Sequence, residues 1–323
     1  MLKPIQLAVF ANVITFLHVG LAATQELKVV ATFSIIGDMA KNVGSDRIDL
    51  VTLVGPDGDA HVYEPKPADA AALAGADVIL VNGLGFEGFL SRLVEASGSK
   101  APIVELTKGA EVLSSEDEAH HHDDEKHEDH AGEGHDHDSE EGHDHHGPND
   151  PHAWQSVHNA ETYVENIAEA FCAADAAGCD AYRANAEAYT DKLEALEDEI
   201  EAAVAAIPAD KRTIITSHDA FGYFQHEYGL TFHAPEGVST DAEASAADVA
   251  ALIRQIREDK AAAIFVENIT NQRLIEQIAS ETGLSIGGAL YSDALSGPDG
   301  PAATYIDMMR HNITTIKGAI LGS

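Results

Sequence analysis

Short runs of apolar and β-branched residues alternate with amphipathic stretches in both halves of this chain. In the first half these runs predict strands over residues 27–32, 48–54, 76–82 and 102–106. In the second half they predict strands over residues 212–218, 230–235, 261–268 and 284–290. Apolar residues three and four positions apart predict helices at 35–44, 67–76, 246–260, 272–283 and 304–321. Strands that alternate with helices indicate an α/β fold with parallel sheets and crossover helices.

The middle of the chain has a different pattern. Residues 180–207 contain neither Gly nor Pro and are rich in Ala, Glu and Leu, which are good helix formers. A helix of about 27 residues would be ~40 Å long at 1.5 Å per residue, which exceeds the diameter of one small lobe. We therefore predict a first lobe at 24–179, a rigid linking helix at 180–207 and a second lobe at 208–323. Such a helix permits tilting of the lobes but resists wide closure.

The N-terminus has the order of a secretory signal peptide. Lys3 precedes an apolar run over residues 5–21, and small residues follow it. We predict a signal peptide at residues 1–23 with cleavage just after Ala22 or Ala23. The alternative is a membrane anchor, but the run is short against the about 20 apolar residues of a membrane span. No Cys lies near the cleavage region, which argues against a lipid anchor.

Composition restricts the class of partner. The 323 residues are 45% apolar, as in a globular protein, and are enough for two domains. The 55 acidic against 19 basic residues give a net charge of −36, which argues against nucleic acid or an anionic membrane and favours a cationic ligand. Cys172 and Cys179 are the two cysteines. Their spacing of seven in an exported chain predicts a local disulfide across a helix end.

One insertion stands out within this globular pattern. Ten of the eighteen histidines lie at residues 120–146, and almost all the other residues there are Asp, Glu or Gly. These histidines are His120, His121, His122, His127, His130, His135, His137, His143, His145 and His146. Because such a segment cannot bury a core, we predict a disordered loop at 116–148. It can bind several zinc ions weakly, as an accessory that gathers or senses zinc. The alternative is an inert, solvated loop.

The sequence GLGFEG at residues 83–88 matches the G-x-G-x-x-G fingerprint of dinucleotide-binding folds. It follows the third predicted strand of its lobe, however, and not the first strand-to-helix turn of such a fold. Glu87 would also place a carboxylate beside a pyrophosphate. We interpret the motif as a glycine-rich strand-to-helix turn.

Four residues able to bind a metal follow predicted strands or the histidine-rich insertion. They are His61, His152, His218 and Asp293. Because ligands of open α/β sheets lie at the carboxyl ends of strands, two residues from each half would meet in the cleft between the lobes. Three imidazoles and one carboxylate suit Zn²⁺, whereas Mg²⁺ and Ca²⁺ prefer oxygen ligands. The alternative for each single histidine is a helix cap or a hydrogen-bonded core residue.

The stretches HVYEPKPAD, DPHAW, SHDAFGYF and SDALSGPDGPAATYIDMMRHN carry a resemblance. They resemble, in the same order, the metal-specific solute-binding proteins of ABC importers, and are most similar to the zinc branch of this family (ZnuA/AztC-like, cluster A-I). The resemblance implies two (β/α)4-like lobes joined by a long helix, with a metal between the lobes. It implies imidazole ligands at His61, His152 and His218 and a carboxylate ligand at Asp293. The manganese branch generally has Glu at the third position, so His218 favours zinc. Some zinc members have water in place of the fourth ligand.

Glu267 ends a predicted strand on the same expected face. It could accept a hydrogen bond from a ligand N–H, serve as an alternative oxygen ligand, or be a solvated acid. Four further histidines that follow the histidine-rich insertion match no motif, and we interpret them as surface or packing residues. They are His158, His226, His233 and His311.

These observations predict a periplasmic, monomeric binding protein, not an enzyme. It would capture Zn²⁺ between the lobes and deliver it to the permease and ATPase of an ABC importer, and a periplasmic metallochaperone could load it. One alternative is a protein that binds manganese or another divalent metal. A second is a zinc hydrolase with Glu267 as the general base, although the chain has no H-E-x-x-H motif. A third is an adhesin or a zinc buffer.

Overall fold

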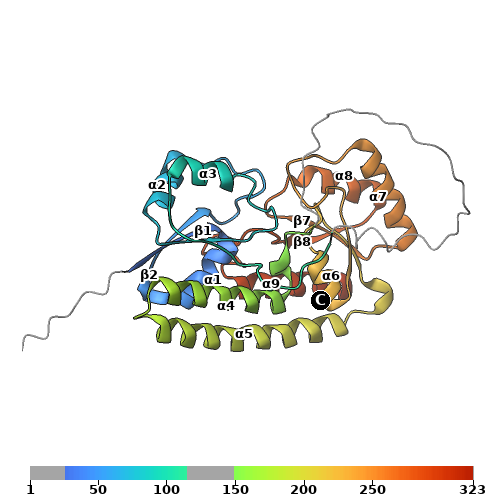
Figure 1. The fold of residues 1–323 in the computed structure, drawn as a ribbon. Helices are drawn as coiled ribbons and strands as arrows, with labels where there is room; N and C mark the ends of the chain where they lie inside the picture. Colours follow the sequence, from blue (N-terminus) through green and yellow to red (C-terminus); the bar gives the residue numbers. More distant parts are fainter. Residues whose placement is uncertain (1–25, 115–148, 323) are drawn as a thin grey trace, which may run out of the picture.

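Two lobes, each built on a parallel β-sheet, lie side by side in the computed structural model of the protein (Figure 1). The structure describes residues 26–114 and 149–322. The strand order is β2-β1-β3-β4 in the first lobe and β6-β5-β7-β8 in the second. Neighbouring strands of both sheets are parallel. The predicted α/β fold with a parallel sheet in each half is confirmed.

The elements alternate along the chain as the apolar pattern predicts. The first lobe contains β1 (Leu27–Phe33), α1 (Ser34–Gly44), β2 (Ile48–Val54), α2 (Pro67–Gly75), β3 (Val78–Val81), α3 (Leu90–Ser97), β4 (Ile103–Glu105), the short helix η3 (Ala153–Gln155) and α4 (Val157–Ala174). The second lobe contains β5 (Thr213–Ile215), α6 (Gly222–Tyr228), β6 (Thr231–His233), α7 (Ala246–Asp259), β7 (Ala263–Glu267), α8 (Gln272–Thr282), β8 (Ile286–Leu290) and α9 (Tyr305–Leu321). Two further 3₁₀ turns are η1 (Ser45–Arg47) and η4 (Ala209–Lys211).

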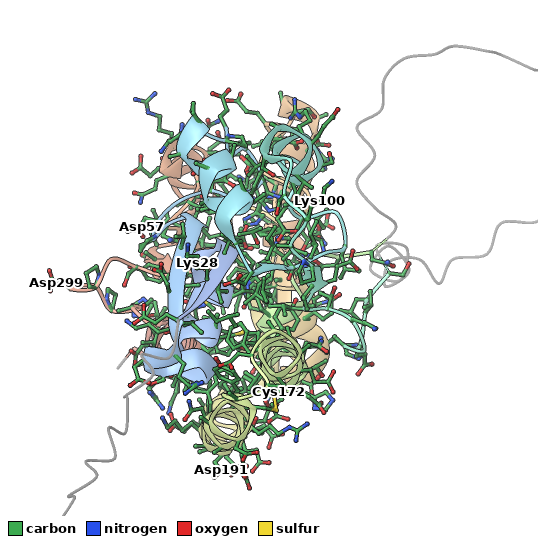
Figure 2. All side chains as sticks on the ribbon, turned by 60° about the vertical axis from the view of Figure 1, so that its left-hand side comes forward. Lys28, Asp57, Lys100, Cys172, Asp191 and Asp299 are labelled. Carbon is green, nitrogen blue, oxygen red and sulfur yellow. A yellow bond between two sulfur atoms is a disulfide. The ribbon has the colours of Figure 1, made fainter. Side chains whose placement is uncertain are left out.

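The long helix α5 (Cys179–Ala205) runs beneath both lobes (Figure 1). It packs against α1 and α4 of the first lobe and against α6 and α9 of the second. It ends two residues before the predicted position, shortly ahead of Pro208, which cannot continue a helical hydrogen-bond pattern. The predicted disulfide is present and joins Cys172 of α4 to Cys179, the first residue of α5 (Figure 2).

One apolar cluster continues from the first lobe into the second. It contains Trp154 of η3, Leu193 of α5 and the α6 aromatic residue Phe224, all fully or almost fully buried. A smaller cluster lies between the second sheet and helices α7 and α8, and includes Ile264 and Ile275. The two lobes therefore share a core at their base.

Two predicted segments lie outside the described residues. These are the signal peptide at 1–23 and the histidine-rich loop at 116–148. The flanks of the loop are paired: Ser114 and Asn149 form an antiparallel bridge, and the Asp150 N–H donates to the Leu113 carbonyl oxygen at 3.0 Å. Within the described part of the chain, no helix combines the length and apolar character that a membrane span requires.

The GLGFEG motif forms a tight turn after β3, in which Gly83 and Gly85 have positive φ angles of 92° and 83°. The buried carboxylate of Glu87 accepts the N–H groups of Asn82 at 2.6 Å and Gly83 at 3.2 Å. It also accepts the Thr32 hydroxyl at 2.6 Å. In a dinucleotide site the N–H groups of this turn would face a phosphate. Here Glu87 occupies them, which favours the interpretation as a structural turn.

Candidate metal centre

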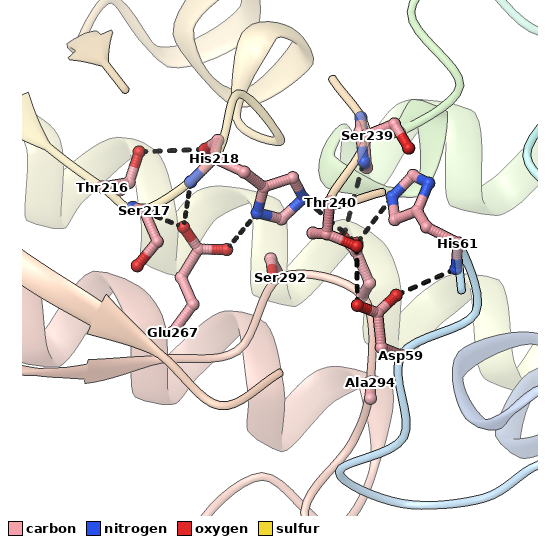
Figure 3. Close-up of polar contacts among 12 residues, drawn as sticks. Asp59, His61, Thr216, Ser217, His218, Ser239, Thr240, Glu267, Ser292 and Ala294 are labelled. Atoms are coloured by element: carbon pink, nitrogen blue, oxygen red, sulfur yellow. Dashed lines mark hydrogen bonds and ion pairs between the residues drawn. The ribbon is translucent and has the colours of Figure 1, made fainter. Parts of the chain in front are cut away.

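His61, His152, His218 and Asp293 lie close together between the two lobes, where the sequence predicts a cleft. Each offers one ligand atom, and these four atoms all lie within 4.8 Å of one another. His61 follows β2, His152 precedes η3, His218 follows β5 and Asp293 follows β8. Figure 3 shows the rings of His61 and His218 approaching the same point from opposite sides. The four sequence-predicted residues are thus brought to one place.

Asp293 is at the centre of this group. Its Oδ2 lies 3.1 Å from Nε2 of His61 and 3.1 Å from Nε2 of His218. Its Oδ1 lies 3.6 Å from Nε2 of His152, and neither of these two buried atoms has a hydrogen-bond partner among the described residues. Because an unpaired buried polar atom costs free energy, the arrangement suits a cation that all four side chains contact.

Two of the imidazoles are held from behind by buried carboxylates. Asp150 Oδ1 lies 2.7 Å from Nδ1 of His152 and accepts the His152 backbone N–H at 2.9 Å. Glu267 Oε2 lies 2.7 Å from Nδ1 of His218. Its Oε1 accepts the backbone N–H groups of Ser217 at 2.7 Å and His218 at 2.9 Å (Figure 3). A carboxylate at Nδ1 favours a proton there, so that Nε2 faces the centre as an acceptor or metal ligand.

Glu267 is fully buried, so it is not a solvated strand-end acid. Its oxygens point to the back of His218 and to backbone N–H groups, away from the point where the four ligand atoms meet (Figure 3). This is the position of a group that orients a ligand, and not that of an additional oxygen ligand.

Sequence reasoning missed two aspartates that support the centre. Asp59 Oδ1 accepts the backbone N–H of His61 at 2.9 Å, and its Oδ2 accepts the hydroxyl of Thr240 in the second lobe at 2.6 Å (Figure 3). Asp150 supports His152 in the way described above. Both aspartates stand two residues before a histidine, in the pattern D-x-H, and this spacing is the signal that could have identified them.

The charges of the centre are strongly coupled. Burial alone would lower the pKa of His152, but the carboxylates of Asp293 and Asp150 outweigh it and raise this pKa to about 9. For His218, burial is likewise outweighed by Glu267 and Asp293, so its pKa lies well above the usual value. Burial would raise the pKa of Asp293, yet His218 and His152 hold it well below its usual value. Without a metal, protons on the imidazoles balance the carboxylates.

The other described histidines lie apart from this group. His158 is 3.9 Å from Glu161, and His226 is 3.8 Å from Glu111, both near the surface. His233 is 3.4 Å from Asp259. His311 donates its Nε2–H to the Ala289 carbonyl oxygen at 3.0 Å. The ten histidines of the loop lie outside the described residues.

Two α/β lobes on a long helix, with a buried group of metal-ligand side chains between them, define a solute-binding protein for a metal ion. A family model described as "Zinc-uptake complex component A periplasmic" (ZnuA) matches residues 29–319. The chain therefore belongs to the ZnuA family of periplasmic metal-binding proteins of ABC importers.

The names of similar proteins refer to different metals. The manganese-binding lipoprotein MntA of Halalkalibacterium halodurans is 34% identical over 294 residues, which cover 91% of this chain and 88% of the relative. The iron-binding protein YfeA of Yersinia pestis is 31% identical over 292 residues, which cover 90% and 86%. The solved periplasmic zinc binding protein TroA from Treponema pallidum has a TM-score of 0.79 and 29% identity, covering 92% of this chain and 99% of that one.

A manganese-bound periplasmic metal binding protein from Candidatus Liberibacter asiaticus has a TM-score of 0.75 and 30% identity, covering 92% of this chain and 100% of that one. The agreement extends over both lobes, and the predicted α/β fold of two lobes is thus confirmed. The chain is thus a metal-binding component of the kind of uptake complex that its family model describes.

Proposed function

We propose that this protein captures Zn²⁺ between its lobes and delivers it to the permease of an ABC importer. The observation that carries the proposal is the convergence of three imidazole nitrogens and one carboxylate within 4.8 Å, from His61, His152, His218 and Asp293. Three nitrogen donors and one oxygen donor match the four-coordinate shells in which proteins hold Zn²⁺. In this proposal all four side chains are ligands, and Asp150 and Glu267 orient two of them.

The second candidate cargo is manganese or another divalent metal. The names of several relatives favour it, since they describe manganese- or iron-binding proteins. The ligand chemistry at position 218 favours zinc, because a third imidazole replaces the oxygen donor that Mn²⁺ prefers.

A zinc hydrolase is a poorer explanation of the same residues. The family consists of solute-binding proteins. A hydrolytic site needs a general base beside an open metal position. Glu267, the candidate for this base, instead contacts Nδ1 of His218 and two backbone N–H groups.

We further propose that the protein acts as a monomer free in the periplasm after cleavage behind Ala22 or Ala23. Several relatives are described as lipoproteins, but both cysteines of this chain are joined in the disulfide. The histidine-rich loop would be an accessory that gathers zinc or senses it, and a metallochaperone could supply the metal. The mass of the exported protein tests the cleavage: it should correspond to a chain that begins at Ala23 or Thr24.

Metal competition tests the cargo. The purified full chain is dialysed against equal concentrations of Zn²⁺ and Mn²⁺ and then against metal-free buffer, and the retained metals are quantified. Dialysis should remove the zinc ions that the histidine-rich loop binds weakly, and the wild type should keep one zinc between the lobes. His61→Ala and Asp293→Ala should lose this ion. His218→Glu should shift the retained metal toward manganese. Retention of manganese in preference to zinc by the wild type would overturn the zinc proposal and leave the metal-binding class intact.

A further inference from the structure

The segment that carries Asp293 leaves the second lobe before it reaches the cleft. Strand β8 ends at Leu290, and Tyr291 is still held by the second-lobe helix α9. There the Tyr291 N–H donates to Asn312 Oδ1 at 2.9 Å, and Asn312 Nδ2 donates to the Tyr291 carbonyl at 2.7 Å. From Ser292 onward the hydrogen-bond partners change.

The residues on both sides of Asp293 are bonded to the first lobe. The Ser292 carbonyl accepts Nε1–H of Trp154 at 2.9 Å and Nε2–H of Gln155 at 2.8 Å. The Leu295 N–H donates to Oγ of Ser34, the first residue of α1, at 2.9 Å. The Leu295 carbonyl accepts the Asp57 N–H, just after β2, at 2.8 Å.

The far end of the segment is bonded to the same lobe. The Tyr305 N–H, at the start of α9, donates to Oδ2 of Asp38 in α1 at 3.0 Å. The Tyr305 hydroxyl donates to the Trp154 carbonyl at 2.7 Å. A second-lobe donor, Asn268 Nδ2, reaches the Ala294 carbonyl at 3.2 Å, and the same amide also lies 3.1 Å from Asp57 of the first lobe.

The residues that hold His218, in contrast to those around Asp293, belong to the second lobe. It follows β5 of the second sheet, and its ring and backbone N–H both contact Glu267 at the end of β7. Its carbonyl accepts the Thr216 hydroxyl at 3.2 Å.

On the approach to His152, the Pro151 carbonyl accepts Nδ2–H of Asn82 in the first lobe at 2.8 Å, and the Asp150 carbonyl accepts the Tyr223 hydroxyl of α6 at 2.8 Å. The His152 ring itself is held by Asp150 and not by a residue of the second sheet.

We propose that Asp293 belongs mechanically to the first lobe, so that His61, His152 and Asp293 form a three-ligand half-site and His218 is the ligand that joins last and leaves first. The proposal rests on the proposed metal-binding function. It replaces the sequence expectation that each lobe contributes two ligands. A relative tilt of the lobes would then separate one ligand from three, and not two from two.

Single ligand substitutions test this division. In His218→Ala the half-site is intact, so one zinc should remain bound through dialysis, with weaker affinity in competition with a chromophoric chelator. His61→Ala, His152→Ala and Asp293→Ala each break the half-site and should lose the ion. Loss of zinc from His218→Ala as complete as from Asp293→Ala, or better retention by Asp293→Ala, would overturn the proposal.

The connections of the segment supply a second test with a matched control. Ser34→Ala combined with Gln155→Leu removes two first-lobe contacts to the backbone beside Asp293 without touching a ligand. The pair should weaken zinc binding by about 10-fold, the lower end of the loss seen when direct partners of metal ligands are removed. Asn268→Ala removes the second-lobe contact and should change the affinity much less. The unfolding midpoint of each metal-free variant shows that it is folded. Equal or reversed effects would overturn the proposal.

The outcome for the wild type separates the two proposals. If the wild-type protein retains no zinc, the proposed function itself is wrong. If it retains one zinc but the variants do not follow the order above, only the three-plus-one division is wrong.

Discussion

The imidazoles of His152 and His218 lie between carboxylates. Asp293 is on the inner side of both rings, and Asp150 and Glu267 are on the outer sides. The outer carboxylates fix which nitrogen faces the cleft and raise its basicity as a metal ligand. The inner one supplies the negative charge that a dication needs. Selectivity and acid sensitivity of this site therefore depend on pairs of residues and not on ligands alone.

Glu267→Gln should weaken zinc affinity by about 10- to 100-fold, because the amide of Gln can no longer accept from both the His218 ring and the backbone N–H groups. Competition with a chromophoric zinc chelator measures the change. Glu227→Gln, which removes the same charge from an exposed position in α6, is the control and should bind as the wild type does. Unchanged affinity of Glu267→Gln would mean that Glu267 does not orient His218.

Zinc binding should release protons. Since the pKa of His152 is raised to about 9 and that of His218 lies well above its usual value, both imidazoles hold a proton in the metal-free protein at pH 7. Zinc must displace these protons, so about two should be released per ion at pH 7, and affinity should fall as pH falls below about 9. Calorimetric titrations in buffers of different ionisation enthalpy count the protons. Binding without proton release would contradict this charge assignment.

Sequence could predict the four central residues, since strand ends and the family resemblance both point to His61, His152, His218 and Asp293. It could not predict how they are supported. Glu267 and His218 are far apart along the chain, and their contact depends on the register of β5 beside β7. Asp150 was open to prediction from the D-x-H spacing.

At the scale of elements, the ends of the parallel strands position the cleft residues. The strand predicted at 212–218 ends at Ile215, and the turn that follows places His218 beside Glu236 in a bridge. The apolar runs predict where the strands lie along the chain. The residues at which the strands end depend on hydrogen bonds to neighbouring strands, which the sequence does not show. The short helix α6 was not predicted, because seven residues give too little periodicity to distinguish a helix.

The disulfide fixes the junction of α4 and α5. Replacing Cys172 and Cys179 by Ser should lower the free energy of unfolding by about 2 to 3 kcal/mol, as expected for removing the constraint on a short loop. Denaturant unfolding of the metal-free protein measures this. Zinc affinity should stay unchanged, since the four cleft residues lie on other elements. A large loss of affinity would show that the helix junction also positions the ligands.

The paired flanks of the histidine-rich loop allow its removal. Because Ser114 and Asn149 are bridged, a short Gly/Ser turn can replace residues 115–148 without separating them. This deletion should lower the number of zinc ions bound and leave one tight ion, as judged by equilibrium titration. A chain that instead loses the tight ion would show that the loop is part of the main site and not an accessory.

At the scale of the whole molecule, α5 and the shared apolar cluster connect the two lobes at their base. The cleft residues lie above this connection, and Thr240 and Asp59 form a further contact across it. A rigid base favours small tilts over wide opening. In the proposed function, a metal that contacts both lobes would distinguish a loaded shape from an empty one. The sequence predicted the long helix, but it could not predict that the segment after β8 forms hydrogen bonds with the first lobe.

X-ray absorption of the zinc-loaded protein, measured on the form with residues 115–148 replaced, tests the central claim most directly. We predict one zinc with four ligands, three nitrogens and one oxygen, at about 2.0 to 2.2 Å. The same measurement on dialysed Asp293→Ala should find no bound zinc. A shortened protein that takes up no zinc, or a shell without imidazole nitrogen, would contradict the account.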